Sequence, residues 1–583
     1  MDRFLITMSA LFLLHPVQST AADPVAESRE ITDVRVEMRD GVKLMTDVYL
    51  PRGAGPFPVI LCRVPYGTRT DYVFQPAVAK FFTEHGFAYV TQNVRGRFGS
   101  EGAFTAYVSG QEIPDAYDTI DWIVGQEWSD GNLGVMGESY YGYTTLAAAA
   151  SGHPAIKAIS PANITLAREK QVLDGAYPIQ ASGLWTLSMD DAVNGEYQDT
   201  GEIDLYHLPL LTLGEAHGLR DVLWRERVSG YQDSPVARLA KAQDDYTKIR
   251  VPALHFGGWY DSFTRGTIAI WEGIRKSGQS ASDKQWLVMG PWDHDATSYH
   301  LSGSNPATSI GRRDYGTAAV SSYGDTLLEF FGYFLKGEDN GFIDQPKVKY
   351  FNIGDDNWRV AEQWPPRSSE SRSFFFHSNG DAESAADGVL NVERPENEPA
   401  DFFVYDPRDP VTINERVSVW SRAAQQPDRA ELLLRDDVLT FESSALQDDL
   451  EITGPIAVEL YASSSAPDTD FTAALVDVYP DGYSLLIQEG ILRTSYRDKN
   501  AEPSPISPGE INALVIDLWA TSYTMPAGHR IRVEISSSNF PRFARNLNNG
   551  EPFGTSDRIE IAEQVIYHSA DYPSRLILPV MSD

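Results

Sequence analysis

The chain has 583 residues, 42% of them hydrophobic and 11% aromatic, which is enough for packed cores and too long for a single compact one. Its 48 lysines and arginines stand against 82 aspartates and glutamates, giving a formal net charge of −34. A surface this acidic repels phosphate backbones and anionic headgroups, which excludes nucleic acid as a partner. We expect two or three domains.

The N-terminus has the pattern of a secretory signal peptide over residues 1–22. An apolar run at 4–14 leads into small residues and is too short to span a bilayer. Asp2 offsets Arg3 ahead of this run, so a buried N-terminal helix is the alternative. No later segment has the length and apolar character of a membrane span, and the single cysteine, Cys62, rules out disulfides within the chain. We expect a secreted or periplasmic protein.

Strand and helix patterns alternate through the first half of the chain. Two strand patterns at 34–38 and 42–50 flank an Asp40-Gly41 turn, which predicts a hairpin. Helical stretches such as 116–125 separate continuous apolar runs. Runs of this kind predict a parallel sheet that is covered on both faces. The apolar runs are residues 59–62, 87–91, 133–136, 156–159, 253–256 and 286–289.

The pattern changes twice more along the chain. Between residues 162 and 249, Leu, Tyr, Trp and charged residues follow a helix-like spacing without a strand run. An insertion between strands of an α/β sheet lies above the carboxyl edge, where ligands bind, so this segment is interpreted as a helical cap. From 366 to 583, short strands separated by turn residues predict a β-sandwich or jelly roll.

The stretch 134–150 predicts a strand, a tight turn and a helix, with Ser139 at the turn. Such a turn lifts a serine hydroxyl out of the sheet, and Gly137 relieves crowding in its backbone. The G-x-S-x-G pattern fails, because Tyr141 holds the second glycine position and Gly142 comes one residue later. Ser139 is therefore either a nucleophile or the cap of the following helix.

Two later loops supply partners in the order Ser, acid, His that is typical of nucleophilic catalysis on an α/β sheet. Asp261 follows the apolar run at 253–256. His294 follows the run at 286–289, in a Gly-Pro-Trp loop. A base that can take the serine proton, and a carboxylate that can hold the base, favour the nucleophile interpretation.

Other histidines fit this chemistry less well. His255 lies within a strand pattern and is interpreted as a core residue, while His300 has no partner signal. Asp293, His294 and Asp295 are adjacent, so they cannot all point at one ion. We therefore predict neither a metal nor a cofactor.

Three blocks surround the candidate residues: Gly137-x-Ser139-Tyr140-x-Gly142, Gly258-Trp259-x-Asp261 and Gly290-Pro291-Trp292-x-His294. They resemble the catalytic motifs of the serine hydrolase family that contains cocaine esterase, the α-amino-acid ester hydrolases and the X-Pro dipeptidyl-peptidases. Similar blocks cover nearly the whole mature chain, at residues 39–44, 63–66, 93–102, 470–482 and 528–535. The resemblance implies an α/β-hydrolase domain at 23–161 and 250–365, a helical cap at 162–249 and a C-terminal jelly roll at 366–583.

The resemblance also assigns roles to single residues. It makes Ser139 the nucleophile, His294 the general base and Asp261 the carboxylate that orients the base. The oxyanion would be held by the backbone N–H of Tyr140 and by a tyrosine hydroxyl, whose position Tyr66 matches. The alternative for Tyr66 is an ordinary half-buried aromatic at a strand end.

The sequence leaves the substrate class open. Asp261 is followed by Ser262-Phe263-Thr264, which departs from the acidic residues that α-amino-acid ester hydrolases carry there. Asp190, Asp191 and Glu196 could receive a free amine, as dipeptidyl peptidases require, or could be solvated helix charges. Four aromatic residues of the predicted cap suggest an aromatic, apolar pocket: Trp185, Tyr177, Tyr197 and Tyr206.

These patterns favour a serine hydrolase that cleaves uncharged acyl or aryl esters through an acyl-enzyme. An X-Pro dipeptidyl-peptidase stays open, as does an amide acylase of the β-lactam precursor or α-amino-acid ester type. A homo-oligomer also stays open. The non-enzymatic alternative is a jelly roll that binds carbohydrate or a partner beside an inert hydrolase half.

Overall fold

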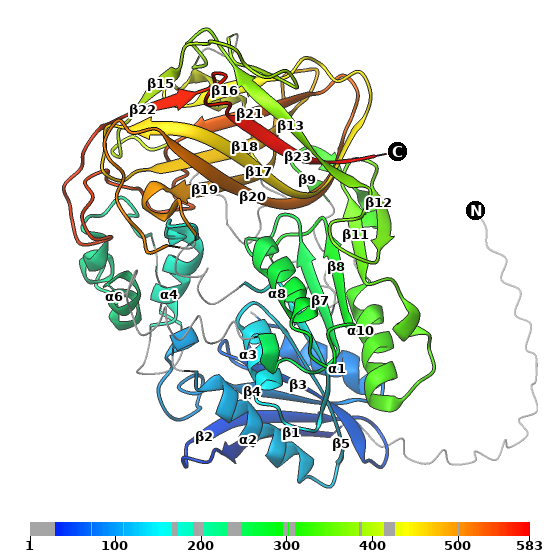
Figure 1. Cartoon of the computed structure of the whole chain (residues 1–583). Coiled ribbons are helices and arrows are strands. Elements are labelled where there is room, and N and C mark those ends of the chain that lie inside the picture. Colours follow the sequence, from blue (N-terminus) through cyan, green and yellow to red (C-terminus); the bar gives the residue numbers. More distant parts are fainter. Residues whose placement is uncertain are drawn as a thin grey trace, which may run out of the picture.

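The computed structural model describes residues 29–582 except for 71–72, 109, 166–172, 191–196, 199, 201, 230–245, 295–300, 302–308, 321, 384–386, 413–425 and 500. The predicted signal peptide, residues 1–22, lies outside the described residues. The described chain forms two large β-sheets, with most of the helices around the first (Figure 1). None of the helices in the described ranges has the length and apolar character to cross a membrane.

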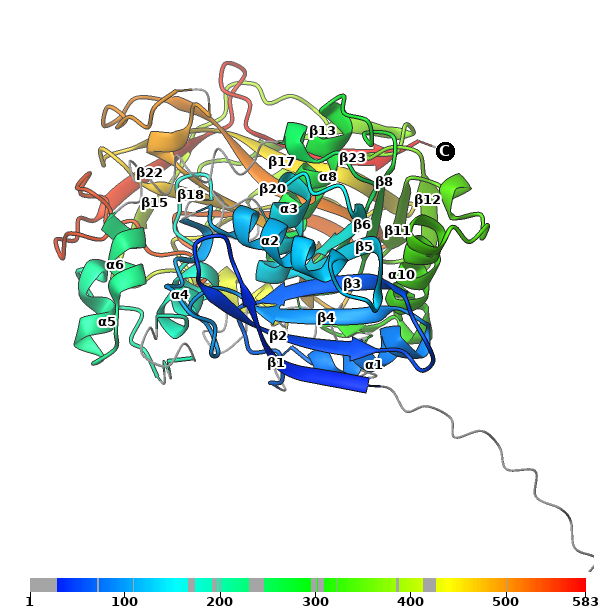
Figure 2. The same ribbon diagram turned by 90° about the horizontal axis from the view of Figure 1, so that it is seen from below.

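Ten of the described strands form the first sheet, in the order β1-β2-β4-β3-β5-β6-β7-β8-β11-β12. Neighbours from β4 to β11 pair in parallel, as the continuous apolar runs predict, and the outer strands pair antiparallel. β1 and β2 form the predicted hairpin, and they lie beside β4 and β3 in the view from below (Figure 2). The strands are β1 (Arg29–Glu37), β2 (Lys43–Leu50), β3 (Phe57–Val64), β4 (Ala88–Asn93), β5 (Ser129–Glu138), β6 (Ile156–Ala162), β7 (Ala253–Gly258), β8 (Gln285–Gly290), β11 (Val348–Asn352) and β12 (Asn357–Ala361).

Helix α3 (Ser139–Ala150) begins directly where β5 ends and is buried over most of its length. It lies against β3, β5 and β6. The run Ala147–Ala150 suits this place, because alanine has the highest helix propensity and lets neighbouring backbones approach closely. The start of α3 is therefore held by the core of the first domain. The other helices of this domain are α1 (Gln75–Glu84), α2 (Glu112–Val124), α8 (Thr264–Lys276) and α10 (Tyr323–Phe331).

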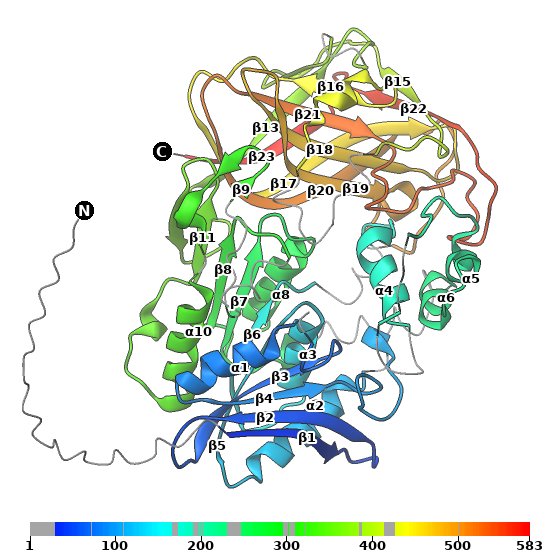
Figure 3. The same cartoon turned by 180° about the vertical axis from the view of Figure 1, so that it is seen from behind.

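Residues 163–252 lie between β6 and β7 and are called here the inserted segment. Its described helices are short: α4 (Leu184–Ser188), α5 (Leu213–Ala216) and α6 (Val222–Ser229). Trp224 of α6 is fully buried in a small core with Tyr177 and Leu187, and Ala544 from the C-terminal part of the chain joins this core. The inserted segment therefore packs beneath the second sheet, as Figures 1 and 3 show.

Eleven described strands, β13 to β23, form the second sheet, and the region they build is called here the β-rich domain. Most of its neighbouring strands pair antiparallel. The strands are β13 (Ser369–His377), β14 (Val389–Asn391), β15 (Asp401–Tyr405), β16 (Leu439–Glu442), β17 (Leu450–Ser464), β18 (Asp470–Val478), β19 (Ser484–Arg493), β20 (Asn512–Met525), β21 (Arg530–Ser536), β22 (Ala562–Tyr567) and β23 (Arg575–Met581).

The β-rich domain shares its core with the first domain. Trp259 and Met289, from the region of β7 and β8, lie in the same apolar cluster as the inner side chains of the second sheet. Gln488 of β19 donates a hydrogen bond from Nε2 to the carbonyl oxygen of Trp259 at 2.8 Å. The β-rich domain therefore supports the backbone of the loop that follows β7.

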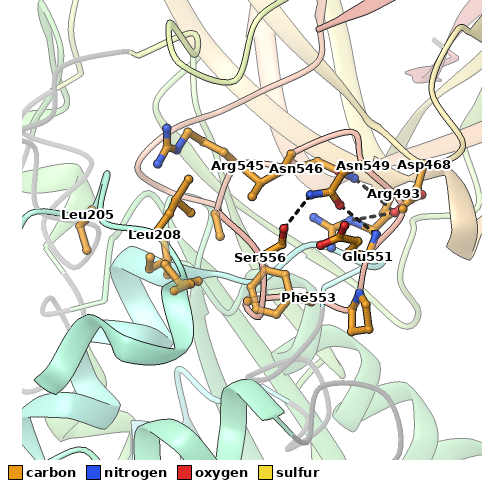
Figure 4. A pocket seen from close by; sticks show the side chains of 17 residues that line it. Leu205, Leu208, Asp468, Arg493, Arg545, Asn546, Asn549, Glu551, Phe553 and Ser556 are labelled. Atoms are coloured by element: carbon orange, nitrogen blue, oxygen red, sulfur yellow. Dashed lines mark hydrogen bonds and ion pairs between the residues drawn. The ribbon is translucent and has the colours of Figure 1, made fainter. Parts of the chain in front are cut away.

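A narrow crevice separates the inserted segment from the β-rich domain (Figure 4). Leu205 and Leu208 line one side, and Asn549, Phe553 and Ser556 line the other. The space open to the centres of water molecules is about 50 Å³, which is room for only a few of them. Nδ2 of Asn549 donates to Oγ of Ser556 at 3.3 Å, so polar groups of the crevice pair with one another. We assign this crevice to the interface between the inserted segment and the β-rich domain.

Candidate active site

Ser139 occupies the turn between β5 and α3. Its φ of 52° lies in the left-handed region, which a residue other than glycine keeps only where the surrounding structure enforces it. Its backbone N–H donates to the carbonyl oxygen of Asn163 at 3.2 Å, which ties the turn to the end of β6. The residue is 9% exposed. The turn thus has the strained geometry expected of a strand, turn and helix that present a serine.

Close backbone approaches require the two glycines beside this turn. A Cβ at Gly137 would lie 2.4 Å from the carbonyl oxygen of Tyr141 in the first turn of α3. A Cβ at Gly142 would lie 3.0 Å from the carbonyl oxygen of Ala162, where α3 crosses the end of β6. The ring of Tyr141 meets the ring of Tyr66 edge-on, with 6.1 Å between centroids. Helix packing therefore explains why the second glycine stands one residue later than in G-x-S-x-G.

Asp261 and His294 lie at the carboxyl ends of the neighbouring strands β7 and β8. Nδ1 of His294 is 3.2 and 3.1 Å from the two carboxylate oxygens of Asp261. The Oδ1 atom of Asp261 also accepts a 2.6 Å hydrogen bond from the backbone N–H of Phe263, which orients the carboxylate. The ring of Phe263 meets the His294 ring edge-on at 5.0 Å. The structure therefore joins the two predicted residues as a buried carboxylate–imidazole pair.

The Gly-Trp and Gly-Pro-Trp motifs have a structural reason. The loops after β7 and β8 cross closely, and the backbone N–H of Tyr260 donates to the carbonyl oxygen of Trp292 at 3.0 Å. A Cβ at Gly258 would lie 2.1 Å from that same oxygen, and a Cβ at Gly290 would lie 2.3 Å from the Trp292 ring. The two glycines thus permit the crossing that brings Asp261 to His294.

Asn163 connects the serine turn to the histidine loop. It directly follows β6, and its φ is 43°. Its carbonyl accepts the N–H of Ser139, and its Nδ2 donates to the carbonyl oxygen of His294 at 2.9 Å. One residue therefore positions the backbones of both predicted catalytic residues. The sequence interpretation missed Asn163; an asparagine at the end of a strand was its only signal, because asparagine tolerates the left-handed region.

Tyr66 lies just beyond the end of β3 and is 3% exposed. Nε1 of Trp185, in α4, donates to the Tyr66 hydroxyl oxygen at 3.0 Å. Because an indole N–H can only donate, the hydroxyl oxygen of Tyr66 is the acceptor in this bond. The ring of Tyr197 stacks on Tyr66 at 6.2 Å. The inserted segment therefore supplies two aromatic neighbours of the predicted oxyanion hydroxyl.

Tyr140 is the second residue of α3 and is fully buried. Its N–H belongs to the first turn, whose N–H groups have no acceptor within the helix. Its hydroxyl donates to Glu112 at 3.1 Å, and Glu112 forms an ion pair with Arg63 at 2.9 Å. Burial raises the pKa of the Glu112 carboxyl, and Arg63 offsets part of this rise. The ring of Trp185 stacks on Tyr140 at 5.8 Å, so one indole contacts both predicted oxyanion residues, Tyr66 and Tyr140.

The acidic residues considered as amine receptors fall into two groups. Asp190 is 3% exposed and accepts the backbone N–H of Leu223, at the start of α6, at 2.6 Å. Its Oδ1 lies 3.4 Å from Nε of Arg220. Asp190 is therefore a buried acceptor that fixes α6, which differs from both a solvated charge and an open amine site. Asp191 and Glu196 lie outside the described residues.

The other candidates are placed as follows. His255 lies inside β7, and burial lowers the pKa of its imidazole to about 4, so its prediction as a core residue is confirmed. Tyr177 lies in the core of the inserted segment, and the ring of Tyr206 packs on that of Phe540 with 4.5 Å between centroids. His300 and Asp295 lie outside the described residues. In the part of the chain that the structure describes, no three His, Cys, Asp or Glu side chains gather closely enough to hold a metal ion.

A parallel sheet with a strained serine turn after β5, and with a buried carboxylate–imidazole pair after β7 and β8, defines a hydrolase of the α/β-hydrolase class. Residues 40–296 match the X-Pro dipeptidyl-peptidase (S15 family) model, and residues 340–577 match the X-Pro dipeptidyl-peptidase C-terminal non-catalytic domain. The chain is 33% identical to cocaine esterase from Rhodococcus sp. (strain MB1 Bresler), over 94% of this chain and 98% of that protein. It therefore belongs to the cocaine esterase and X-Pro dipeptidyl-peptidase family of serine hydrolases.

Two solved structures share this architecture. An α-amino acid ester hydrolase superposes with a TM-score of 0.83 and 27% identity, over 96% of this chain and 98% of its own. An aminopeptidase from a marine sediment Thaumarchaeota archaeon superposes with a TM-score of 0.84 and 25% identity, over 97% of this chain and 98% of its own. The predicted family is confirmed, as is a hydrolase fold followed by a C-terminal β-rich domain.

Proposed function

We propose that the protein cleaves carboxylic esters through an acyl-enzyme formed on Ser139. The observation that carries the proposal is the buried contact of 3.1 Å between Nδ1 of His294 and Asp261, at the sheet edge where β5 delivers Ser139. An imidazole whose Nδ1 is held by a carboxylate presents Nε2 as a base. Asn163 supports the assignment, because it links the backbones of Ser139 and His294.

In the proposed reaction, Nε2 of His294 takes the hydroxyl proton of Ser139 while the serine oxygen attacks the ester carbonyl carbon. The carbonyl oxygen becomes an oxyanion, which accepts hydrogen bonds from the N–H of Tyr140 and the hydroxyl of Tyr66. When this intermediate collapses, the C–O bond to the alcohol breaks and His294 returns the proton to the leaving oxygen. Water then repeats the sequence on the acyl-enzyme, which releases the acid and restores Ser139.

We interpret the inserted segment as the helical cap and the β-rich domain as the jelly roll of this enzyme. The interpretation of the cap is supported by Trp185 and Tyr197, which reach from the inserted segment to Tyr66. The interpretation of the jelly roll is supported by the long antiparallel pairings among β17, β20 and β23 and by the core they enclose. In this arrangement the cap covers the carboxyl edge of the first sheet.

Replacing Tyr66 by phenylalanine is expected to lower kcat about 10²–10³-fold, because the oxyanion loses one donor. Trp185→Phe should cost about tenfold, because an aromatic ring is kept there while the N–H that bonds to the Tyr66 hydroxyl is lost. Steady-state kinetics with p-nitrophenyl butyrate measure both effects. Tyr206→Phe is the control, since Tyr206 packs on Phe540. An unchanged kcat in Tyr66→Phe would show that this hydroxyl does not serve the oxyanion.

A matched pair of chromogenic substrates tests the ester assignment. We expect the protein to release nitrophenol from p-nitrophenyl butyrate and to leave Ala-Pro-p-nitroanilide intact. The buried Asp190 is already bound to α6 and is not placed to receive a free amine. Ser139→Ala is the control for background hydrolysis. Strong release of nitroaniline by the wild type would instead identify a dipeptidyl peptidase, with Asp191 and Glu196 as the residues to examine for amine binding.

A further inference from the structure

The inserted segment buries an arginine, two of whose nitrogens have no hydrogen-bond acceptor in the described part of the chain. Arg227 lies in α6 and is 2% exposed. Among the described residues, neither its Nε nor its Nη1 has a hydrogen-bond partner. Burial lowers the pKa of its guanidinium, which shows that the surroundings disfavour the charge. A buried cation with unused donors is costly, and such a group needs an explanation.

Aromatic rings are the neighbours that Arg227 does have. Its Cζ lies 5.6 Å from the ring centroid of Tyr107 and 5.6 Å from that of Trp185. The ring faces attract the positive charge, but they do not replace the directed hydrogen bonds of a carboxylate. The rings therefore hold the guanidinium in place while its N–H groups stay available.

A second buried arginine beside the inserted segment, Arg97, has a structural role because backbone carbonyl oxygens accept its hydrogen bonds. Nε of Arg97 donates to the carbonyl oxygen of Pro65, and its Nη1 donates to that of Met189, each at 3.0 Å. Arg97 thereby links the loop of Tyr66 to the inserted segment with satisfied donors. Arg227 has ring contacts similar to those of Arg97 and lacks such acceptors among the described residues.

The buried carboxylates of the surrounding elements are already in use. Glu112, which bonds to Tyr140, forms an ion pair with Arg63 at 2.9 Å. Asp190 accepts backbone N–H groups from the first turn of α6, the helix that carries Arg227. Arg227 is therefore a positive charge that these carboxylates do not balance.

Trp185 connects Arg227 to the proposed reaction centre. Its ring contacts the guanidinium, and its Nε1 bonds to the hydroxyl oxygen of Tyr66 at 3.0 Å. Tyr107 makes a second connection, because its ring lies 4.8 Å from that of Tyr140. A ligand group at Arg227 would thus lie about one aromatic side chain away from the proposed donor on Tyr66. A short carbon chain spans such a separation.

We propose that Arg227 binds a carboxylate of the substrate, so that the preferred substrates are esters with a second, free carboxylate, such as monoesters of short dicarboxylic acids. This inference rests on the proposed ester hydrolysis at Ser139. The planar guanidinium matches a carboxylate with two parallel N–H···O bonds, which is the geometry that its unused donors offer. The net charge of −34 repels anions, so a local buried cation is what such a substrate would need.

This substrate class differs from the uncharged ester that the sequence favours. The sequence places Arg227 in a charged, helix-like stretch, where an arginine is normally solvated. Only the folded chain shows that this side chain turns inward onto Trp185 and Tyr107. The substrate prediction therefore changes through a single buried side chain.

The test compares monobenzyl glutarate with the benzyl ester of glutaramic acid, in which an amide replaces the free carboxylate at equal size. Benzyl esters are chosen because a free carboxylate attacks an activated aryl ester within the same molecule. Released benzyl alcohol is measured by chromatography. We expect the wild type to prefer the glutarate ester about 10²-fold in kcat/KM, and Arg227→Gln to abolish this preference. Arg225→Gln, a more exposed arginine of the same helix, should keep the preference.

A second measurement separates this inference from the proposed function. Ser139→Ala retains Arg227, and it should bind glutarate with a change in tryptophan fluorescence, because Trp185 lies against the guanidinium. Arg227→Gln in that background should abolish the change. Cleavage of both esters without preference for the glutarate ester would overturn the role of Arg227 and leave ester hydrolysis standing. Failure to cleave either ester, with glutarate still bound through Arg227, would overturn the ester hydrolysis and leave the binding of a carboxylate by Arg227 standing.

Discussion

Ser139→Ala is expected to lower kcat for ester cleavage by about 10⁵–10⁶-fold, because no other group can form the acyl-enzyme. The fold should survive, since the hydroxyl is not needed for the backbone bond between the Ser139 N–H and Asn163. Alanine, like serine, must adopt the positive φ, so the strain of the turn is unchanged by the substitution. Stopped-flow and steady-state assays with p-nitrophenyl butyrate measure the loss.

Covalent labelling gives the matching structural evidence. A fluorophosphonate probe should modify Ser139 in the wild type, and the mass shift should fall on the peptide that contains the start of α3. Ser182→Ala serves as the control, because Ser182 is a buried serine of the inserted segment outside the proposed machinery. Full activity of Ser139→Ala, or labelling at a different serine, would contradict the proposed nucleophile.

Asp261→Asn should lower kcat about 10⁴-fold while leaving the fold intact. The N–H of Phe263 occupies Oδ1 of Asp261 at 2.6 Å, so an asparagine would keep its oxygen there and turn its NH₂ toward Nδ1 of His294. Nδ1 would then have to accept, and the proton would move to Nε2, where a base is required. Asn163 holds the backbone of His294, so a simple shift of the loop does not return the imidazole proton to Nδ1.

Kinetics combined with thermal unfolding test this expectation. Asp261→Asn should keep a melting temperature near that of the wild type while losing kcat. Asp190→Asn is the contrasting variant, because Asp190 is a buried carboxylate that holds the start of α6, and its loss should mainly lower stability. If Asp261→Asn kept more than a tenth of the wild-type kcat, Asp261 would not be the orienting carboxylate.

The catalytic sheet could be predicted because its inner strands are buried on both sides and therefore appear as continuous apolar runs. Asp261 and His294 could be located for the same reason. Each follows such a run within a few residues, and parallel strands deliver their carboxyl ends to one edge. The glycines of the two loops carried information as well, since the crossing at Trp292 leaves no room for a Cβ.

The inserted segment could not be predicted at the same level. Its helices are short, and α6 buries Trp224 and Arg227 on a helix without a clear apolar stripe, so periodicity gave no guide to the inward face. The contact of Trp185 with Tyr66 joins residues far apart in the sequence, and so does the bond that the Leu223 N–H donates to Asp190. Such contacts depend on how the segment folds back onto the sheet, which local residue patterns do not encode.

The bond from Gln488 to the backbone of Trp259 has a consequence for the synthesis of the chain. Trp259 lies two residues before Asp261, and its indole is also held by the carbonyl oxygen of Phe351 at 2.8 Å. A ribosome makes Ser139, Asp261 and His294 well before it makes Gln488. The growing chain therefore carries the three proposed catalytic residues before it carries Gln488, which supports the loop of Asp261. We infer that hydrolytic activity arises only after β19 has joined the β-rich domain against this loop, so a product that ends before Gln488 would be inactive.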